Sequence, residues 1–343
     1  MDFTGLDLPF IWFILVGTLL TGYAILDGFD LGVGALHLLT DTDDERRIML
    51  NAIGPVWDGN EVWLVTGGGA LFAAFPAVYA AVFSGFYVAV MLLLALLIFR
   101  AVAIEFRSKQ PGRAWRRAWD AAFSAASIGI ALLMGVTLGN IIAGVPVGPE
   151  RDFTLPLTAL LNPYALLVGV TTVALFMMHG AIYLVMKTEG EMQRRVRGWV
   201  NNAIIFFVIA YVTTTMATLL YMPHMGEPFK ERPALFAIAL TGMLAIANIP
   251  REVHHGREFR AFLSSVASIA SLMALFAVGM YPNLVMSTLS PAYHLTVRNA
   301  ASSPTTLSVM LTVAVIGIPF VLAYTVAIYW IFRGKVRLDS ASY

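Results

Sequence analysis

Long apolar stretches recur along the whole chain, and they constrain its fold more than any other feature. A helix that crosses a bilayer needs roughly 20 mostly apolar residues, and the 343-residue chain supplies such stretches repeatedly. Hydrophobic residues make up 59% of the chain and charged residues only 13%, whereas a soluble domain holds about 25% charged residues. The sequence therefore predicts an all-α integral membrane protein and excludes a soluble enzyme. A net charge of +1, without a basic patch, also argues against nucleic acid as a partner.

Charged residues, Pro and Gly divide the apolar sequence into nine predicted transmembrane helices. We expect one polytopic domain over residues 1–343, with a four-helix bundle over 1–144, a second over 157–281 and a ninth, peripheral helix over 305–332. The spans are predicted near 8–38, 50–74, 77–105, 116–144, 157–186, 198–222, 233–249, 258–281 and 305–332. Asp2 and Asp7 replace the basic stretch of a cleavable signal peptide, so the first helix is expected to stay.

The positions of Lys and Arg predict how the helices are oriented. With the N-terminus outside, 17 of the 22 Lys and Arg residues fall in inner segments and four in outer segments, while Arg100 lies within a span. Cytoplasmic loops of membrane proteins carry the excess of positive charge. We therefore expect the N-terminus outside and the C-terminus in the cytoplasm.

A short internal repeat suggests the two bundles. Gly17 precedes Asp27 by ten residues in the first span, and Gly169 precedes His179 by ten in the fifth; a glycine follows each. Four helices separate the two elements, so both halves would share one orientation and be related by an axis along the membrane normal.

Ionisable residues inside the spans gather toward the inner side of the membrane. Asp27 and Asp30 come late in the inward first span, whereas Asp58 and Glu61 come early in the outward second span. The i, i+3 spacing puts the two carboxylates of each pair on one helix face. Charged groups in a membrane are costly and mark candidate functional sites. They would form either a proton path that opens to the inside or a structural cluster.

The neighbours of each acid favour different interpretations. Small residues surround Asp27 and Asp30, which suggests close helix packing and a structural pairing with Arg100, Arg46 or Arg47. For Asp58 the proton path is preferred, because a polar and aromatic cluster that a simple packing helix does not need surrounds it in the sequence: Trp57, Asn60, Glu61 and Trp63. Glu105 and Lys109 have i, i+4 spacing, which alone is typical of an interfacial salt bridge.

The histidines and the absence of cysteine limit the cofactors. The chain has six His and no Cys, and haem b in a bundle usually takes two axial ligands from facing helices. His179 is the only histidine deep within a predicted span, and His37 lies near the inner end of the first. A lone buried histidine is more often a hydrogen-bonded core residue than a ligand. We therefore expect no haem or metal held by this chain alone.

Two motifs identify the chain as similar to a known family. Asp27-Gly-Phe-Asp-Leu-Gly-Val-Gly34 precedes Asn51-Ala-Ile-Gly-Pro-Val-Trp-Asp-Gly-Asn-Glu-Val-Trp-Leu64, and Phe106-Arg-Ser-Lys109 follows. This order resembles subunit II of the cytochrome bd-type quinol oxidases, closely over about the first 140 residues and more loosely through Leu161-Asn-Pro163 to the last span. The resemblance implies a respiratory oxidoreductase of the bacterial or archaeal cytoplasmic membrane that oxidises quinol and reduces dioxygen to water.

The resemblance also implies partners and roles. Subunit I carries two b-type haems and one d-type haem, and subunit II is its haem-free partner, which in some members holds a structural quinone. The expected partners are subunit I, a small single-span subunit, quinol and lipids. A cytoplasmic proton path between the subunits uses the Asp of Trp-Asp-Gly-Asn, here Asp58, an acid and a Lys matching Glu105 and Lys109, and a C-terminal Tyr, here Tyr343.

Two other functions compete with the proton-path subunit. A purely structural subunit would only stabilise and assemble the haem-bearing chain. A proton-coupled secondary transporter would place acidic residues near the membrane midplane on broken helices, whereas the acids here lie toward the inner side. Replacing Asp58 by Asn separates the first two functions, because only a proton path loses turnover in a complex that still assembles.

Overall fold

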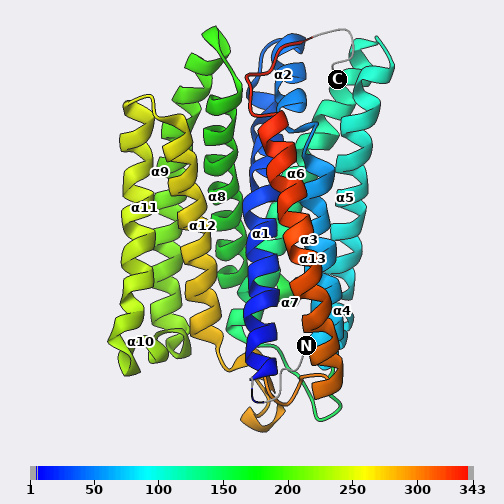
Figure 1. Ribbon diagram of the computed structural model, residues 1–343, viewed down its shortest axis with the longest axis vertical. Coiled ribbons are helices and arrows are strands. Elements are labelled where there is room, and N and C mark those ends of the chain that lie inside the picture. Colours follow the sequence, from blue (N-terminus) through cyan, green and yellow to red (C-terminus); the bar gives the residue numbers. More distant parts are fainter. Residues whose placement is uncertain (1–4, 6, 339–343) are drawn as a thin grey trace.

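The computed structural model describes residue 5 and residues 7–338, which form a bundle of long helices (Figure 1). The N-terminal end of the first helix and the end of the last lie at opposite ends of the bundle. The long helices are α1 Leu8–Leu36, α3 Trp57–Ala74, α5 Tyr87–Phe106, α6 Arg113–Ala143, α8 Pro163–Lys187, α9 Gly190–Tyr221, α11 Phe236–His254, α12 Glu258–Met280 and α13 Pro304–Ile331. The shorter ones are α2 Asp43–Ile53, α4 Pro76–Gly85, α7 Leu157–Leu160 and α10 Glu227–Glu231.

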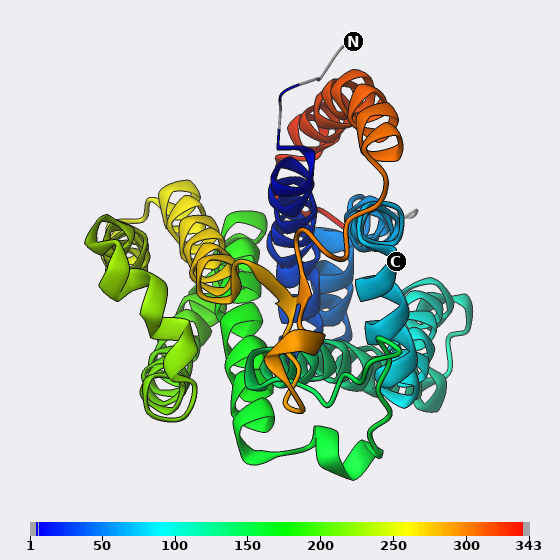
Figure 2. The ribbon, with the colours of Figure 1, turned by 90° about the horizontal axis from the view of Figure 1, so that it is seen from below.

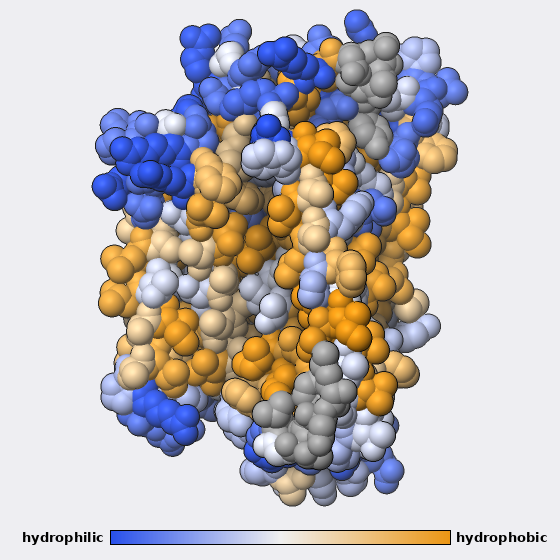
Figure 3. All heavy atoms as spheres, in the orientation of Figure 1, coloured by the Kyte–Doolittle hydropathy of each residue, from blue (hydrophilic) through white to orange (hydrophobic). Residues whose placement is uncertain are grey.

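Eight helices of the described part are long and apolar enough to cross a membrane: α1, α5, α6, α8, α9, α11, α12 and α13. They match eight of the nine predicted spans, and the prediction of an all-α integral membrane protein is confirmed. The remaining long helix, α3, is not among the eight, because its first two turns carry Asp58, Asn60 and Glu61. On the face shown in Figure 3, an apolar belt lies between hydrophilic residues gathered at both ends.

Two predicted spans are divided in the structure. The predicted range 50–74 contains the end of α2 as well as α3. Helix α2 spans Asp43–Ile53, and a capping box of Thr42 and Glu45 stabilises its first turn. Pro55 separates α2 from α3. The range 77–105 is interrupted at Phe86, whose backbone (φ −98°, ψ 25°) is not helical. A Cβ atom on the neighbouring Gly85 would lie 2.1 Å from the ring of Phe153. An incoming aromatic ring therefore occupies the space at this break.

The centre of the molecule is the crossing of α1 and α8. Their backbones meet at two glycines, and a Cβ atom on Gly32 would lie 1.8 Å from the carbonyl oxygen of Phe176, while one on Gly180 would lie 2.5 Å from Gly32. Seen from below, α9, α11 and α12 lie on one side of this crossing, α4 and α5 lie on the other, and α13 lies at the periphery (Figure 2). Small residues thus permit the close approach that builds the core.

A small non-helical cap closes the end of the bundle where α1 begins. The strands β1 Asn283–Val285 and β2 Leu295–Thr296 pair antiparallel, and Val145 bridges to Ser287. The Ser287 hydroxyl donates to the carbonyl of Val147 (2.7 Å). The cap therefore ties the segment after α6 to the segment after α12.

Candidate functional site: a charged network between α1, α3 and α5

A buried ion pair links α1 and α5. Both Nη atoms of Arg100 donate to the carboxylate of Asp27, at 2.8 and 2.5 Å, and the two side chains are 1% and 0% exposed. This two-point geometry is the strong form of an arginine–carboxylate contact. Of the three partners that the sequence left open, Arg100 is the one that binds Asp27. The other two candidates bind elsewhere, since Arg46 contacts Asp120 and Arg47 contacts Asp44.

The network reaches the surface through α3. Glu61 Oε1 lies 3.0 Å from Nη2 of Arg100, and its side chain is 22% exposed. Asp58, one turn earlier on α3, is exposed and lies in the first turn of the helix, where the helix dipole favours a negative charge. Carboxylates therefore lead from the surface to a fully buried guanidinium within one turn of α3.

Asn60 joins three helices beside this path. Its amide nitrogen donates to Oδ2 of Asp30 (2.7 Å) and to the carbonyl of Leu26 (3.2 Å), and its oxygen accepts from the hydroxyl of Tyr329 on α13 (2.9 Å). Asp30 is fully buried, and its other oxygen, Oδ1, has no hydrogen-bond partner in the described part of the chain. This contact ties the peripheral helix α13 to α1 and α3.

The aromatic neighbours of Asp58 have packing roles. Trp57 is buried in the core. Trp63 is half-buried, and a Cβ atom on Gly22 of α1 would lie 2.2 Å from its ring. The indole of Trp63 therefore covers a glycine on the facing helix.

The other predicted path residues lie at the end of α5. Glu105 is half-buried near the last residue of α5. Lys109 is exposed in the 3-10 turn Arg107–Lys109 that follows this helix. Glu105 is five residues beyond Arg100, roughly 7 Å along the helix axis. Tyr343, the fourth predicted path residue, lies outside the described residues.

A second buried charged cluster at the same end of the bundle was missed by the sequence analysis. Asp120 of α6 accepts from Nε of Arg107 (2.5 Å) and from Arg46 (3.1 Å), and its Oδ1 lies 2.7 Å from Nε2 of His37. Arg107 and Arg116 also bind Asp43, each at 2.7 Å. These residues come from distant parts of the chain, and no local sequence pattern brings them together.

His179 is a core residue held at both ring nitrogens. It is fully buried; Nδ1 lies 2.7 Å from the hydroxyl of Ser265, and Nε2 lies 3.0 Å from the carbonyl of Ile25. Its ring stacks on Phe262 at 5.0 Å. The prediction of a hydrogen-bonded core histidine is confirmed. Among the described residues, no group of three or more His, Asp or Glu side chains is arranged to hold a metal ion.

The fold and this site define a class: a polytopic helical membrane protein whose buried charges gather at one end of an otherwise apolar bundle. The family model described as cytochrome bd terminal oxidase subunit II matches residues 8–332. The chain therefore belongs to the family of cytochrome bd oxidase subunit II.

Known relatives match along nearly the whole chain. Cytochrome bd-I ubiquinol oxidase subunit 2 of Escherichia coli (strain K12) is 38% identical and covers 97% of this chain and 96% of its own. Cytochrome bd ubiquinol oxidase subunit 2 of Bacillus subtilis (strain 168) is 34% identical, and the match covers 95% of this chain and 96% of that protein. The structure of bd oxidase from Geobacillus thermodenitrificans superposes with a TM-score of 0.79 and 18% identity, over 95% of this chain and 99% of that chain.

Membership of this family has direct consequences. The chain is a subunit of a terminal quinol oxidase, an oxidoreductase complex, and subunit II implies a partner subunit I. Its apolar helices make it a multi-pass protein of the bacterial inner membrane.

Proposed function

We propose that the chain acts as the haem-free subunit II of a quinol:dioxygen oxidoreductase. In this role it stabilises the haem-bearing subunit I and contributes a proton-uptake path from the cytoplasm through Asp58, Glu105 and Lys109. The haems of subunit I supply the reduction of dioxygen to water. This chain's residues take up protons at the surface and hold the helices that line the path.

The observation that supports the path most directly is the continuity from Asp58 to Arg100. Asp58 is exposed, Glu61 is partly exposed one turn later, and Arg100 is buried beside Glu61. An exposed carboxylate exchanges protons with water, and a neighbouring carboxylate can receive them. Glu105 and Lys109 extend the polar surface toward the end of α5.

We propose a nine-span topology for the chain. The ninth span is α3, which runs beside α1 with its charged first turns at the end where the arginines gather. That end would face the cytoplasm, with the N-terminus outside and the C-terminus inside, as the Lys and Arg distribution predicts. The apolar belt between two hydrophilic ends is consistent with this placement (Figure 3).

The two-bundle organisation is also proposed. The first bundle would comprise α1, α3, α5 and α6, the second α8, α9, α11 and α12, and α13 would be the peripheral helix. The crossing of α1 and α8 at Gly32 and Gly180 supports an axis between the bundles, because these two helices carry the repeated pair Asp27 and His179. Binding of quinone, of lipids and of a small single-span subunit stays a prediction.

The test uses the intact complex with Asp58→Asn. We expect oxygen consumption with quinol to fall at least about tenfold, because a positioned proton-transfer group typically contributes about 10²–10⁴-fold to a rate. The haem content per complex should stay unchanged. Asp44→Asn is the matched control, because Asp44 is an exposed carboxylate on α2 that lies 3.8 Å from Arg47 and outside the α3 network. Equal turnover of the two variants would contradict the proton path.

A purely structural subunit is the second candidate, favoured by the buried pair of Asp27 and Arg100. It predicts that Asp58→Asn either leaves turnover near normal or prevents assembly. The haem spectrum of the purified variant reveals failed assembly, and its rate of oxygen consumption separates near-normal turnover from a slowed but assembled oxidase. A proton-coupled transporter is a weaker candidate, because the buried acids lie near one end of the helices.

A further inference from the structure

The helix α13 is the least buried of the eight apolar helices, and it lies at the periphery of the bundle (Figure 2). Only Leu307 and Leu311 of its 28 residues are buried, and both lie in its first third. At that end Nε1 of Trp12 donates to the carbonyl of Leu307 (3.0 Å). The second half of α13, which the structure describes in full, contains no buried residue. Contacts other than core packing must therefore hold that half in place.

The chain after α13 folds back onto the end of α8. The N–H of Val336 donates to the carbonyl of Lys187, the last residue of α8 (2.8 Å), and the Val336 side chain packs against the main hydrophobic core. Nζ of Lys335 donates to the carbonyl of Val185 (3.1 Å). In return, Nζ of Lys187 donates to the carbonyl of Phe332, the residue that ends α13. We call these five residues the clasp: Val185, Lys187, Phe332, Lys335 and Val336.

The clasp satisfies the ends of two helices at once. The last four carbonyls of a helix have no partner within that helix, and a cation near a helix C-terminus is stabilising. Each lysine of the clasp binds a carbonyl at the end of the other helix. Lys187 is only 9% exposed, and a hydrogen bond from a charged donor is stronger than one between neutral groups. The clasp therefore fastens the end of α13 to α8.

The clasp lies one turn beyond the residue through which α13 reaches the charged network. Tyr329, three residues before Phe332, donates its hydroxyl hydrogen to the side-chain oxygen of Asn60 (2.9 Å). The amide nitrogen of Asn60 donates to Asp30 on α1 (2.7 Å). The next residue on α3 is Glu61, which belongs to the charged network. A continuous series of contacts thus leads from the end of α8 to the charged turns of α3.

We propose that Lys187 is a positioning residue for proton uptake. By fastening the end of α13, it keeps Tyr329 against Asn60, and this contact fixes the turns of α3 that carry Asp58 and Glu61. The inference rests on the proposed proton path for its effect on turnover. The fastening of α13 by the clasp does not depend on that path.

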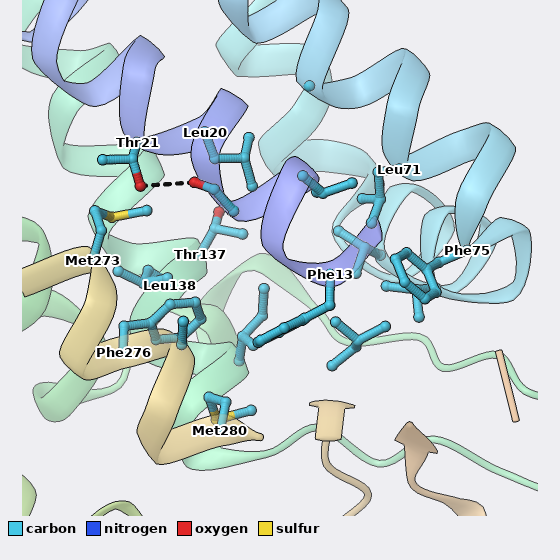
Figure 4. Close-up of a pocket in the computed structure, with 18 of the residues that line it drawn as sticks. Phe13, Leu20, Thr21, Leu71, Phe75, Thr137, Leu138, Met273, Phe276 and Met280 are labelled. Carbon is cyan, nitrogen blue, oxygen red and sulfur yellow. Dashed lines mark hydrogen bonds between the residues drawn. The ribbon is translucent and has the colours of Figure 1, made fainter. Parts of the chain in front are cut away.

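The clasp is remote from the other large feature of the bundle. A large apolar cavity lies in the half where α1 begins, and Phe13 and Met280 are among its lining residues (Figure 4). Among the described residues that line this cavity, none belongs to the clasp, and neither Tyr329 nor Asn60 is one of them. Substitutions in the clasp therefore leave the walls of the cavity unchanged.

The first measurement follows the clasp by digesting the purified complex with trypsin. Trypsin cuts after Lys and Arg, and the peptide N–H of the Lys335–Val336 bond is held by the carbonyl of Lys187. We expect Lys187→Met to speed cleavage of this bond about tenfold or more, because loss of a charged hydrogen bond favours the open state. Lys187→Arg keeps a cationic donor and should restore most of the protection. Arg194→Met is the matched control, because Arg194 is an exposed cation on α9 at the same end of the bundle.

The second measurement is oxygen consumption with quinol by complexes of equal haem content. Lys187→Met should lower kcat about three- to tenfold, with recovery in Lys187→Arg, because the proton-carrying groups remain but are less well placed. The loss should be larger at about pH 8 than at about pH 6, since slow proton uptake limits turnover most where protons are scarce. A general packing defect would lower kcat equally at both.

A double variant tests whether Lys187 acts through Tyr329. Tyr329→Phe should lower kcat by a similar factor, because it removes the same contact with Asn60. Lys187→Met combined with Tyr329→Phe should then lose no more than the larger single loss. Losses that multiply in the double variant would contradict the proposal, and so would a loss in Lys187→Met that is the same at both pH values.

The remaining outcomes show which part of the reasoning fails. Equal cleavage of Lys187→Met and Arg194→Met would refute the clasp. Faster cleavage with normal turnover in Lys187→Met, while Asp58→Asn turns over slowly, would refute the positioning role and leave the proton path intact. Normal turnover in both Lys187→Met and Asp58→Asn would refute the proton path and, with it, this role of Lys187.

Discussion

Removing Arg100 should destabilise the protein strongly, because it leaves a carboxylate buried without its cation. Asp27 is 0% exposed and accepts a hydrogen bond from each Nη atom of Arg100. Breaking a buried ion pair from one side costs about 3–5 kcal/mol. Glu61, the other carboxylate on Arg100, is 22% exposed and can turn toward water. We therefore expect Arg100→Met to lose about 3–5 kcal/mol of unfolding free energy, mostly through Asp27.

A double-mutant cycle separates the cost of leaving Asp27 unpaired from the net contribution of the ion pair to the unfolding free energy. Asp27→Asn alone leaves Arg100 with Glu61 and should cost about 1–3 kcal/mol. Asp27→Asn combined with Arg100→Met removes both charges of the pair, so the loss should shrink to about 1–2 kcal/mol. The two single losses should therefore exceed the double loss by at least about 2 kcal/mol.

The assay is the unfolding of the purified complex in mixed micelles with increasing dodecyl sulfate, followed by tryptophan fluorescence. Arg117→Met is the control, because Arg117 is an exposed arginine on α6, and it should change stability by at most about 0.5 kcal/mol. Additive losses of Arg100→Met and Asp27→Asn would refute the reasoning, and so would a loss below about 1 kcal/mol for Arg100→Met.

Three further variants test contacts elsewhere in the bundle. Ser265→Ala should cost about 1–3 kcal/mol in the same unfolding assay, because it leaves Nδ1 of the buried His179 without its partner. Tyr329→Phe removes the hydrogen bond to Asn60, and should cost about 0.5–1.5 kcal/mol and speed proteolysis within α13. Gly180→Ala should abolish assembly, measured as haem recovered with the tagged chain, since its Cβ atom would lie 2.5 Å from the backbone of Gly32.

Much of the fold could be predicted because membrane helices follow from local composition. Each span needs only its own apolar run, and eight of the predicted ranges correspond to helices long and apolar enough to cross. The breaks were harder to predict. The interruption at Phe86 depends on the ring of Phe153, which comes from a segment far along the chain, and no local pattern reveals that contact.

The candidate site also contains residues that could be predicted from the sequence and residues that could not. Asp27, Arg100 and Glu61 could be predicted as a cluster because each is a charge inside an apolar run. Asp120 and His37 were missed, since they stand near helix ends where charges are common, and their 2.7 Å contact joins residues 83 positions apart. Burial, which the sequence near a helix end does not reveal, distinguishes them from ordinary interfacial charges.

The two charged clusters differ in a way that favours the α3 network as the route for protons. Asp120 is held by Arg107 and Arg46, two permanent cations, besides its contact with His37. In the α3 network two carboxylates share one cation, since both Asp27 and Glu61 contact Arg100. Two cations occupy the oxygen atoms of one carboxylate, whereas two carboxylates that share one cation keep oxygen atoms that can accept a further hydrogen bond. Of these two clusters, the one that ends at the exposed Asp58 is thus better suited to passing protons inward.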